Sequence, residues 1–251
     1  MTVTCAVRDG VAEVVIDHPP VNAITIADTW AIDSTSRDLA RNDDVRAVIL
    51  TAVGRGFNAG IDIKEMQAGD SRALMVESCE ACDAGWEAIW QCPAPVIAAV
   101  NDFCLGVGIG LVASCDMIVA TRHARFALPE VDNGSPGCAS HLARLVPPMK
   151  LRELSLSCRR VSTIDLHAWG SIAHLTDADD LMPVARQLAA DLAAKPRDVL
   201  RYAKAALNHI DIYKKRKAFR LEQGYTYQLN LMGIGDRARN DFIAGTRVMT
   251  R

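Results

Sequence analysis

The sequence predicts one α/β domain with a mainly parallel sheet and a helical C-terminal region. Three observations carry this prediction: short apolar or β-branched segments alternate with helical ones, glycine-rich turns connect them, and the β pattern fades after about residue 162. Strands that alternate with helices are typical of a parallel sheet covered by helices. A length of 251 residues with 50% hydrophobic side chains is sufficient for a sizeable core.

The elements follow in a regular order. Residues 3–7 and 11–16 are β-branched or alternate with polar neighbours, and the turn between them favours a hairpin. Nearly continuous apolar runs predict buried strands at 46–53, 96–100 and 116–120. Helices are predicted from a cap at Thr25 to about Arg41, and over 71–90, 111–114, 180–194, 197–209 and 213 to about 244. We expect a core over residues 1–190 and a helical region over 191–251.

Composition argues against several classes of partner. A net charge of −2, with no basic run longer than residues 214–217, makes nucleic acid a poor partner. No apolar segment approaches the ~20 residues that cross a bilayer, and residues 1–9 do not resemble a secretion signal, so we expect a cytoplasmic protein without a membrane partner. Cys79 and Cys82 form a lone CxxC pair among eight scattered cysteines, which favours reduced, largely buried thiols and no metal.

Two glycine-rich turns, at 54–66 and 101–110, each follow a buried strand and precede a helix. Glycine lets the backbone approach a ligand, and the first N–H groups of a helix lack an internal acceptor, so both turns can offer donors to an anion. Tight helix–strand packing is the favoured interpretation of the second turn taken alone. A dinucleotide site is disfavoured, because its fingerprint should lie at the first strand and be followed by an acidic residue.

Four blocks of sequence together resemble the crotonase (enoyl-CoA hydratase/isomerase) superfamily. They are HPPVNAIT at 18–25, GRGFNAGIDIKEM at 54–66, PVIAAVNDFCLGVGIGLVASCDMIVA at 95–120 and FALPEV at 126–131. Within the superfamily, three segments are similar to ring-opening hydrolases of bacterial steroid breakdown. They are GRGFNAGIDIKEMQ, the short loop from LPEV to HLARLVP, and EQGYTYQLNL. The resemblance implies a crotonase-like spiral of ββα units and a C-terminal helical trimerisation region, which gives a homotrimer or a dimer of trimers. It also implies an acyl-CoA substrate, with coenzyme A as part of the substrate and no tightly bound cofactor.

The resemblance further implies an oxyanion hole made by the backbone N–H groups of Ile61 and Val107. Most members of the superfamily have glycine at the position of Val107. Because the N–H donor belongs to the main chain, we expect Val107 to keep it, and we expect the valine side chain to narrow the substrate pocket. Coenzyme A is expected along residues 21–24 and 59–64, although Lys64 equally suits a solvated surface. The expected contacts are Ala23, Ala59, Ile61, Asp62, Ile63 and Lys64.

Hydratases of this superfamily hold water between two glutamates, and this chain has one of them. Gly110 stands at the position of the first glutamate, and the second glutamate is present as Glu130. Half of the acid/base pair is therefore missing, which disfavours hydration. The family match makes Glu130 the expected general base, whereas an isolated loop glutamate would be expected to face solvent. His141, in a shortened loop, is a candidate to activate or orient water, although a histidine at a helix start often only caps or packs. Glu222 could reach a neighbour's site or face solvent.

These observations lead to one expected reaction, the hydrolytic cleavage of a carbon–carbon bond in a cyclic β-diketone-type acyl-CoA. The expected substrate is a steroid-derived, bicyclic methyl-dioxo-hexahydroindene-carboxyl-CoA. Water activated by Glu130 would add to the ring ketone, and Ile61 and Val107 would stabilise the dienolate that leaves. The alternatives are a hydratase or double-bond isomerase of fatty acyl-CoA, and a non-catalytic acyl-CoA- or RNA-binding relative. Residues between Met66 and Trp90 are expected to line the pocket.

Overall fold

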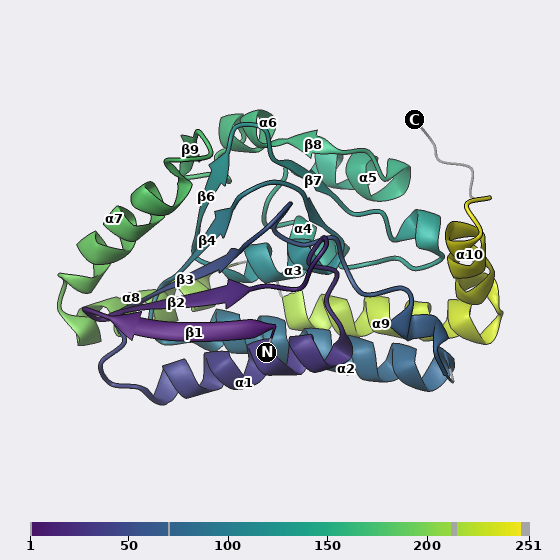
Figure 1. Ribbon diagram of the computed structural model, residues 1–251, viewed down its shortest axis with the longest axis horizontal. Coiled ribbons are helices and arrows are strands. Elements are labelled where there is room, and N and C mark those ends of the chain that lie inside the picture. The colour runs from purple at the N-terminus through teal and green to yellow at the C-terminus, as the bar shows by residue number, and fades with distance from the viewer. Residues whose placement is uncertain (1, 70, 212–214, 247–251) are drawn as a thin grey trace.

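The computed structural model describes residues 2–69, 71–211 and 215–246. A six-stranded sheet forms its centre, with the strand order β1-β2-β3-β4-β6-β9 (Figure 1). Each neighbouring pair is parallel except the β1–β2 hairpin, which confirms the predicted mainly parallel sheet. The strands are β1 (Val3–Arg8), β2 (Val11–Ile16), β3 (Ala47–Ala52), β4 (Val96–Val100), β6 (Met117–Thr121) and β9 (His174–Thr176).

Helices cover both faces of this sheet, which explains why its inner strands are nearly continuous apolar runs. On one face, α7 (Leu181–Ala193) places Ala185 and Ala189 against Ile49, Ile97 and Val119. The other face is covered by α1 (Ile26–Arg41), α2 (Ser71–Gln91) and α3 (Val107–Ser114). Thr25 caps α1 as predicted: its hydroxyl accepts from the Asp28 amide, and the Asp28 carboxylate accepts from the Thr25 amide.

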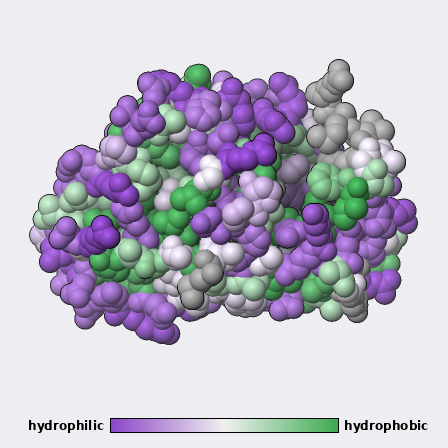
Figure 2. Space-filling model, in the orientation of Figure 1, coloured by the Kyte–Doolittle hydropathy of each residue, from purple (hydrophilic) through white to green (hydrophobic). Residues whose placement is uncertain are grey.

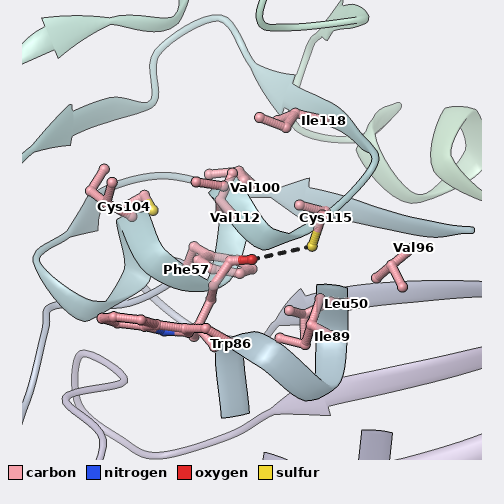
Figure 3. Packing of buried hydrophobic residues seen from close by; sticks show 14 of the residues in the cluster. Leu50, Phe57, Trp86, Ile89, Val96, Val100, Cys104, Val112, Cys115 and Ile118 are labelled. Carbon is pink, nitrogen blue, oxygen red and sulfur yellow. Dashed lines mark hydrogen bonds between the residues drawn. The ribbon is translucent and has the colours of Figure 1, made fainter. Parts of the chain in front are cut away.

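The larger hydrophobic core lies between the sheet and the α1–α3 layer. Figure 3 shows Trp86 and Ile89 reaching into it from α2, with Phe57 from the first glycine-rich turn beside them. The thiol of Cys115 donates to the carbonyl oxygen of Leu111 at 3.3 Å, as a buried cysteine at a helix end often does. Within the described residues, all eight cysteines are free thiols, and most of them are buried.

Short strands and turns are where the sequence prediction fails. A second, three-stranded sheet of β5 (Cys104–Leu105), β7 (Arg125–Ala127) and β8 (Val161–Ser162) was not predicted, because two or three residues are too few to display a period. The expectation that strands end before residue 162 is also wrong. Strand β9 pairs in parallel with β6 and forms the edge of the main sheet.

The C-terminal region is helical, as predicted, but its last helix is divided. The helices are α8 (Arg197–Ile210), α9 (Lys215–Leu231) and α10 (Ile234–Ile243). Gly233 breaks the expected single helix in the left-handed conformation, with φ of 71°. The predicted start at Tyr213 lies outside the described residues. Helix α9 runs beside α2 (Figure 1), where the Gln223 amide donates to the carbonyl oxygen of Cys79 at 2.8 Å.

The remaining helices are short and lie in the connections between strands. They are η1 (Glu65–Gln67), η2 (Val131–Asn133), α4 (Ala139–Leu142), α5 (Pro148–Ser157) and α6 (Thr163–Ala168). On the face in Figure 2, hydrophilic residues predominate and hydrophobic ones gather in smaller clusters between them. Among the described residues, none of the helices has the length and apolar character needed to cross a membrane.

A buried ion pair fastens α8 to the start of β4. The Lys204 ammonium lies 2.7 Å from the Asp116 carboxylate and 3.2 Å from the carbonyl oxygen of Ala94, and the lysine side chain is 5% exposed. The same carboxylate accepts from the Val96 amide at 2.7 Å. Lys204 and Asp116 therefore neutralise each other in a place shielded from bulk water. Removal of one charge would leave the other shielded without a counter-ion.

We expect Lys204→Met to lower the free energy of unfolding by about 3 kcal/mol, because it leaves the Asp116 carboxylate without its cation. Urea unfolding measures this change. Lys150→Met is the matched control: that lysine pairs with Glu153 on the surface and should change the free energy by less than about 0.5 kcal/mol. Equal effects of the two variants would contradict this account of the buried pair.

Candidate active site

The first glycine-rich turn is held by hydrogen bonds on either side of Ile61. The Ile24 amide donates to the carbonyl oxygen of Gly60 at 3.0 Å, and the Asp62 amide donates to that of Ile24 at 2.9 Å. These two bonds fix the backbone in a parallel bridge between Ile24 and Ile61. Among the described residues, the N–H of Ile61 itself donates to no backbone carbonyl, so it is available to a ligand.

The second turn places Val107 as the first residue of α3. Its N–H belongs to the first turn of the helix and has no acceptor within the helix. Gly106 precedes it with φ of 57°, and a Cβ atom there would come within 2.6 Å of Glu130 Oε1 and 3.5 Å of the Gly60 Cα. Only glycine fits this contact. The structure thus brings Ile61, Val107 and Glu130 to the wall of one cavity.

Glu130 presents a shielded carboxylate to this cavity. The residue as a whole is half-buried, but its Oε2 is closed to solvent and has no partner among the described residues. Burial raises the pKa of Glu130 to about 8. Its carbonyl oxygen accepts from the amides of Asn133 and Ser135, and Gly137 packs so closely that a Cβ would lie 2.8 Å from that of Glu130. The side chain is therefore held in place by its own loop.

His141 lies on α4 and is buried behind the cavity wall. Its ring is 4.4 Å from that of Trp86 and 5.6 Å from that of Phe219, and these two aromatic residues line the cavity. Its Nδ1 lies 3.3 Å from the hydroxyl of Ser140. The structure therefore places His141 against the wall that faces Glu130, and its assignment to water activation stays a prediction.

Glu222, which the sequence left open, turns inward within its own chain. Its carboxylate accepts from the amide of Ser140 at 2.8 Å and from the Ser140 hydroxyl at 2.9 Å. Burial raises the pKa of Glu222 to about 7. While Glu222 is ionised, the single proton of the Ser140 hydroxyl is given to it, so Nδ1 of His141 has to donate to that hydroxyl. Ionised Glu222 thereby favours the form of His141 that carries a proton on Nδ1.

The residues expected along coenzyme A lie together beside this cavity. Ala59, Ile61 and Ile63 line an adjoining pocket with Glu130, and the Ala59 amide lies 3.4 Å from the carbonyl oxygen of Asn22, the neighbour of Ala23. The Asp62 carboxylate accepts from the Lys64 amide at 2.8 Å and so closes the turn, while the side chain of Lys64 is exposed. Their contact with coenzyme A stays a prediction.

Helix α2 supplies much of the cavity wall, which confirms that residues between Met66 and Trp90 line the pocket. The contributing positions follow the spacing of one helical face: Met75, Ser78, Cys79, Cys82 and Trp86. Burial raises the pKa of the Cys79 thiol to about 12, and that of Cys82 well above its ordinary value. These thiols are therefore protonated at neutral pH and contribute apolar wall, not nucleophiles. Sequence reasoning missed Cys138, Phe219, Thr226 and Arg239, which reach the two pockets from other elements.

Gly110, on α3, lies directly under the indole of Trp86. A Cβ atom at Gly110 would lie 2.1 Å from Trp86 Cε2 and 2.6 Å from Trp86 Nε1. No side chain fits between them without displacement of the indole. The sequence resemblance matched Gly110 to the first glutamate of hydratases, and the structure fills the space beside this residue with a tryptophan ring from a different helix.

Comparisons with known proteins give matches over most of the chain. The family model described as Enoyl-CoA hydratase/isomerase matches residues 6–231. A protein of Rhodococcus jostii named (7aS)-7a-methyl-1,5-dioxo-2,3,5,6,7,7a-hexahydro-1H-indene-carboxyl-CoA hydrolase is 46% identical over 235 residues, which cover 94% of this chain and 91% of the relative. A protein of Mycobacterium tuberculosis with the same name is 44% identical over 234 residues, with 93% and 95% covered.

The fold has solved counterparts as well. The crystal structure of an enoyl-CoA hydratase from Mycobacterium avium subsp. paratuberculosis superposes with a TM-score of 0.86 at 23% identity, and the match covers 95% of this chain and 98% of that chain. That likeness concerns the fold. The match of the family model over residues 6–231, with the relative that is 46% identical, shows that the chain belongs to the enoyl-CoA hydratase/isomerase (crotonase) family.

Proposed function

We propose that this chain hydrolyses a carbon–carbon bond of a bicyclic acyl-CoA, the hexahydroindene-carboxyl-CoA that gives its relatives from Rhodococcus jostii and Mycobacterium tuberculosis their name. The observation that carries the proposal is the single shielded carboxylate of Glu130, set opposite two free backbone amides with no second carboxylate at Gly110. One carboxylate suffices to activate water for attack on a ketone. A hydratase would need a partner for it.

The chemistry follows from the substrate's name and the position of Glu130. The ring saturation in that name leaves one double bond, between C3a and C4, and a ketone at C1 next to the quaternary C7a. Glu130 takes a proton from water as its oxygen adds to C1. The C1–C7a bond then breaks, C1 becomes a carboxylate, and the electron pair moves through the double bond into the conjugated thioester as a dienolate.

The two backbone amides stabilise that dienolate. In this proposal the N–H groups of Ile61 and Val107 donate to the thioester oxygen, where the negative charge collects, and one such donor is worth about 3 kcal/mol. Protonated Glu130 returns its proton to carbon, so the overall change is the gain of one water. Coenzyme A enters only as part of the substrate, because the hydrolysis is redox-neutral and adds no group other than water.

Incubation of the pure protein with the bicyclic thioester should give a product heavier by one water, with a new carboxylate, as followed by mass spectrometry. Glu130→Gln should lose about 100-fold or more in kcat, because the general base is removed. Unchanged substrate would contradict the hydrolase. Turnover of crotonyl-CoA at ordinary hydratase rates would favour the hydratase or isomerase alternative, and full function in Glu130→Gln would favour a binding protein.

The rate should depend on pH through Glu130. Burial raises the pKa of this carboxyl to about 8, and the general base works only when ionised, so kcat/KM should fall roughly tenfold per pH unit below that value. Initial rates from about pH 6 to about pH 9 measure the profile. Burial also raises the pKa of Glu222, to about 7. The variant Glu222→Gln separates the two titrations, because the change in rate near pH 8 should persist in it. A flat profile would be inconsistent with Glu130 as the base.

We also propose that the chain assembles as a homotrimer or a dimer of trimers. Support comes from large hydrophobic side chains that stay exposed on the C-terminal helices, namely Tyr202, Leu207, Ile210, Leu221, Leu231 and Phe242. Apolar groups of this kind are typical of interfaces between subunits. Sedimentation velocity should therefore give a mass three or six times the 27.2 kDa of the chain, and a monomer would refute the assembly.

A further inference from the structure

The proposed reaction develops negative charge at two separate oxygens. The thioester oxygen is served by the backbone amides of Ile61 and Val107, which line the cavity from its glycine-rich side. The ring ketone is a different atom, and water addition turns its oxygen into an oxyanion before the ring bond breaks. Because the wall of this cavity is mainly apolar, that oxygen needs a second donor, since an unpaired charge against such a wall is costly.

Most polar side chains near Glu130 have their protons committed elsewhere. The Thr226 hydroxyl donates to the carbonyl oxygen of Glu222 at 3.1 Å, which leaves the Ser135 hydroxyl to donate to Thr226 at 3.0 Å. Ser135 also accepts from the Gly137 amide at 3.2 Å. The Cys138 thiol points to the carbonyl oxygen of Gly106 at 3.6 Å. These groups stabilise the cavity wall and have no proton left for a ligand.

Trp86 differs from them. The residue is 3% exposed and lines the same cavity, and its Nε1–H has no hydrogen-bond partner among the described residues. A buried N–H without an acceptor destabilises the free protein by about 1–3 kcal/mol. A ligand atom that accepts from it removes this cost, and binding becomes more favourable by that amount. Trp86 therefore lines the cavity that contains the general base, and its unused donor is buried behind that wall.

The indole is fixed on every side by aromatic and backbone contacts. Its ring lies 4.7 Å from that of Phe219 at an angle of 62° and 4.4 Å from that of His141. Gly110 forms the floor beneath it, and Nε1 stands 2.6 Å from where a Cβ of that residue would be. The nitrogen thus occupies the region that a side chain at position 110 would enter. A donor takes the place where the family's hydratases have a carboxylate.

We propose that the Nε1–H of Trp86 donates a hydrogen bond to the ketone oxygen of the substrate and stabilises the oxyanion formed when water adds to it. This inference rests on the proposed hydrolase function. Glu130 takes the proton of water, the new C–O bond forms at the ketone carbon, and the indole N–H holds the resulting oxyanion without giving up its proton. As the ring bond breaks, the charge passes to the thioester, and the product carboxylate remains beside Trp86. The indole therefore favours substrates with a ring ketone over simple enoyl thioesters.

The test is Trp86→Phe, which removes the N–H and keeps an aromatic ring in the cavity wall. With the bicyclic thioester we expect kcat to fall about 100-fold, as for the loss of one oxyanion donor, with KM changed little. Trp90→Phe is the matched control, because Trp90 lies one turn further along α2, does not line the cavity and is also buried. This control should keep wild-type kcat.

A ligand without the ketone separates lost chemistry from a distorted cavity. Cyclohexenecarboxyl-CoA has the conjugated thioester and no ring ketone, so it should bind wild type and Trp86→Phe with the same Kd in calorimetry. Wild-type kcat in Trp86→Phe, or a weakened Kd for this ligand, overturns the role of the indole. Failure of the wild-type protein to hydrolyse the bicyclic thioester overturns the proposed function itself, whichever residue occupies position 86.

Discussion

The site depends on the close approach of two turns that are distant in the sequence. Gly60 and Gly106 hold φ angles of 98° and 57°, which other residues rarely adopt, and the absence of a side chain at Gly106 lets the Glu130 carboxylate lie against it. A methyl group at residue 106 would come within 2.6 Å of Glu130 Oε1 and would strain the backbone before Val107, so both the carboxylate and that amide would shift at the cavity. The sheet and its helices hold the turns at this distance, so the packing of the whole domain determines the chemistry of a few atoms.

That arrangement stores free energy at the site. Glu130 Oε2 and the Nε1 of Trp86 are both buried without partners among the described residues, and each such group costs about 1–3 kcal/mol in the free protein. The large core between the sheet and α1–α3 offsets the cost, since a domain of this size buries many apolar side chains. A bound substrate restores the missing partners. Binding energy is therefore concentrated where the charges develop.

The sequence predicted what a short window of residues can encode. The runs at 46–53 and 96–100 became β3 and β4, and the cap at Thr25 began α1, because burial on both faces and capping are local patterns. The break at Gly233 was missed because an isolated glycine is compatible with a helix until its packing is known. The place of Trp86 was equally hidden. A tryptophan on the apolar face of a helix is expected to be a core residue, and only the fold shows that it lines the cavity of Glu130.

Residues 86 and 110 are constrained as a pair, because the indole of Trp86 occupies the space that a side chain at residue 110 would need. A glutamate at residue 110 would collide with the indole, since even its Cβ would lie 2.1 Å from Trp86 Cε2. A smaller residue in place of Trp86, with Gly110 unchanged, would leave a void against His141 and Phe219 and no donor at all. In the proposed reaction, the indole from α2 takes the space beside Gly110 of α3 and offers a donor to an oxyanion, at the position where the sequence resemblance places a carboxylate in hydratases.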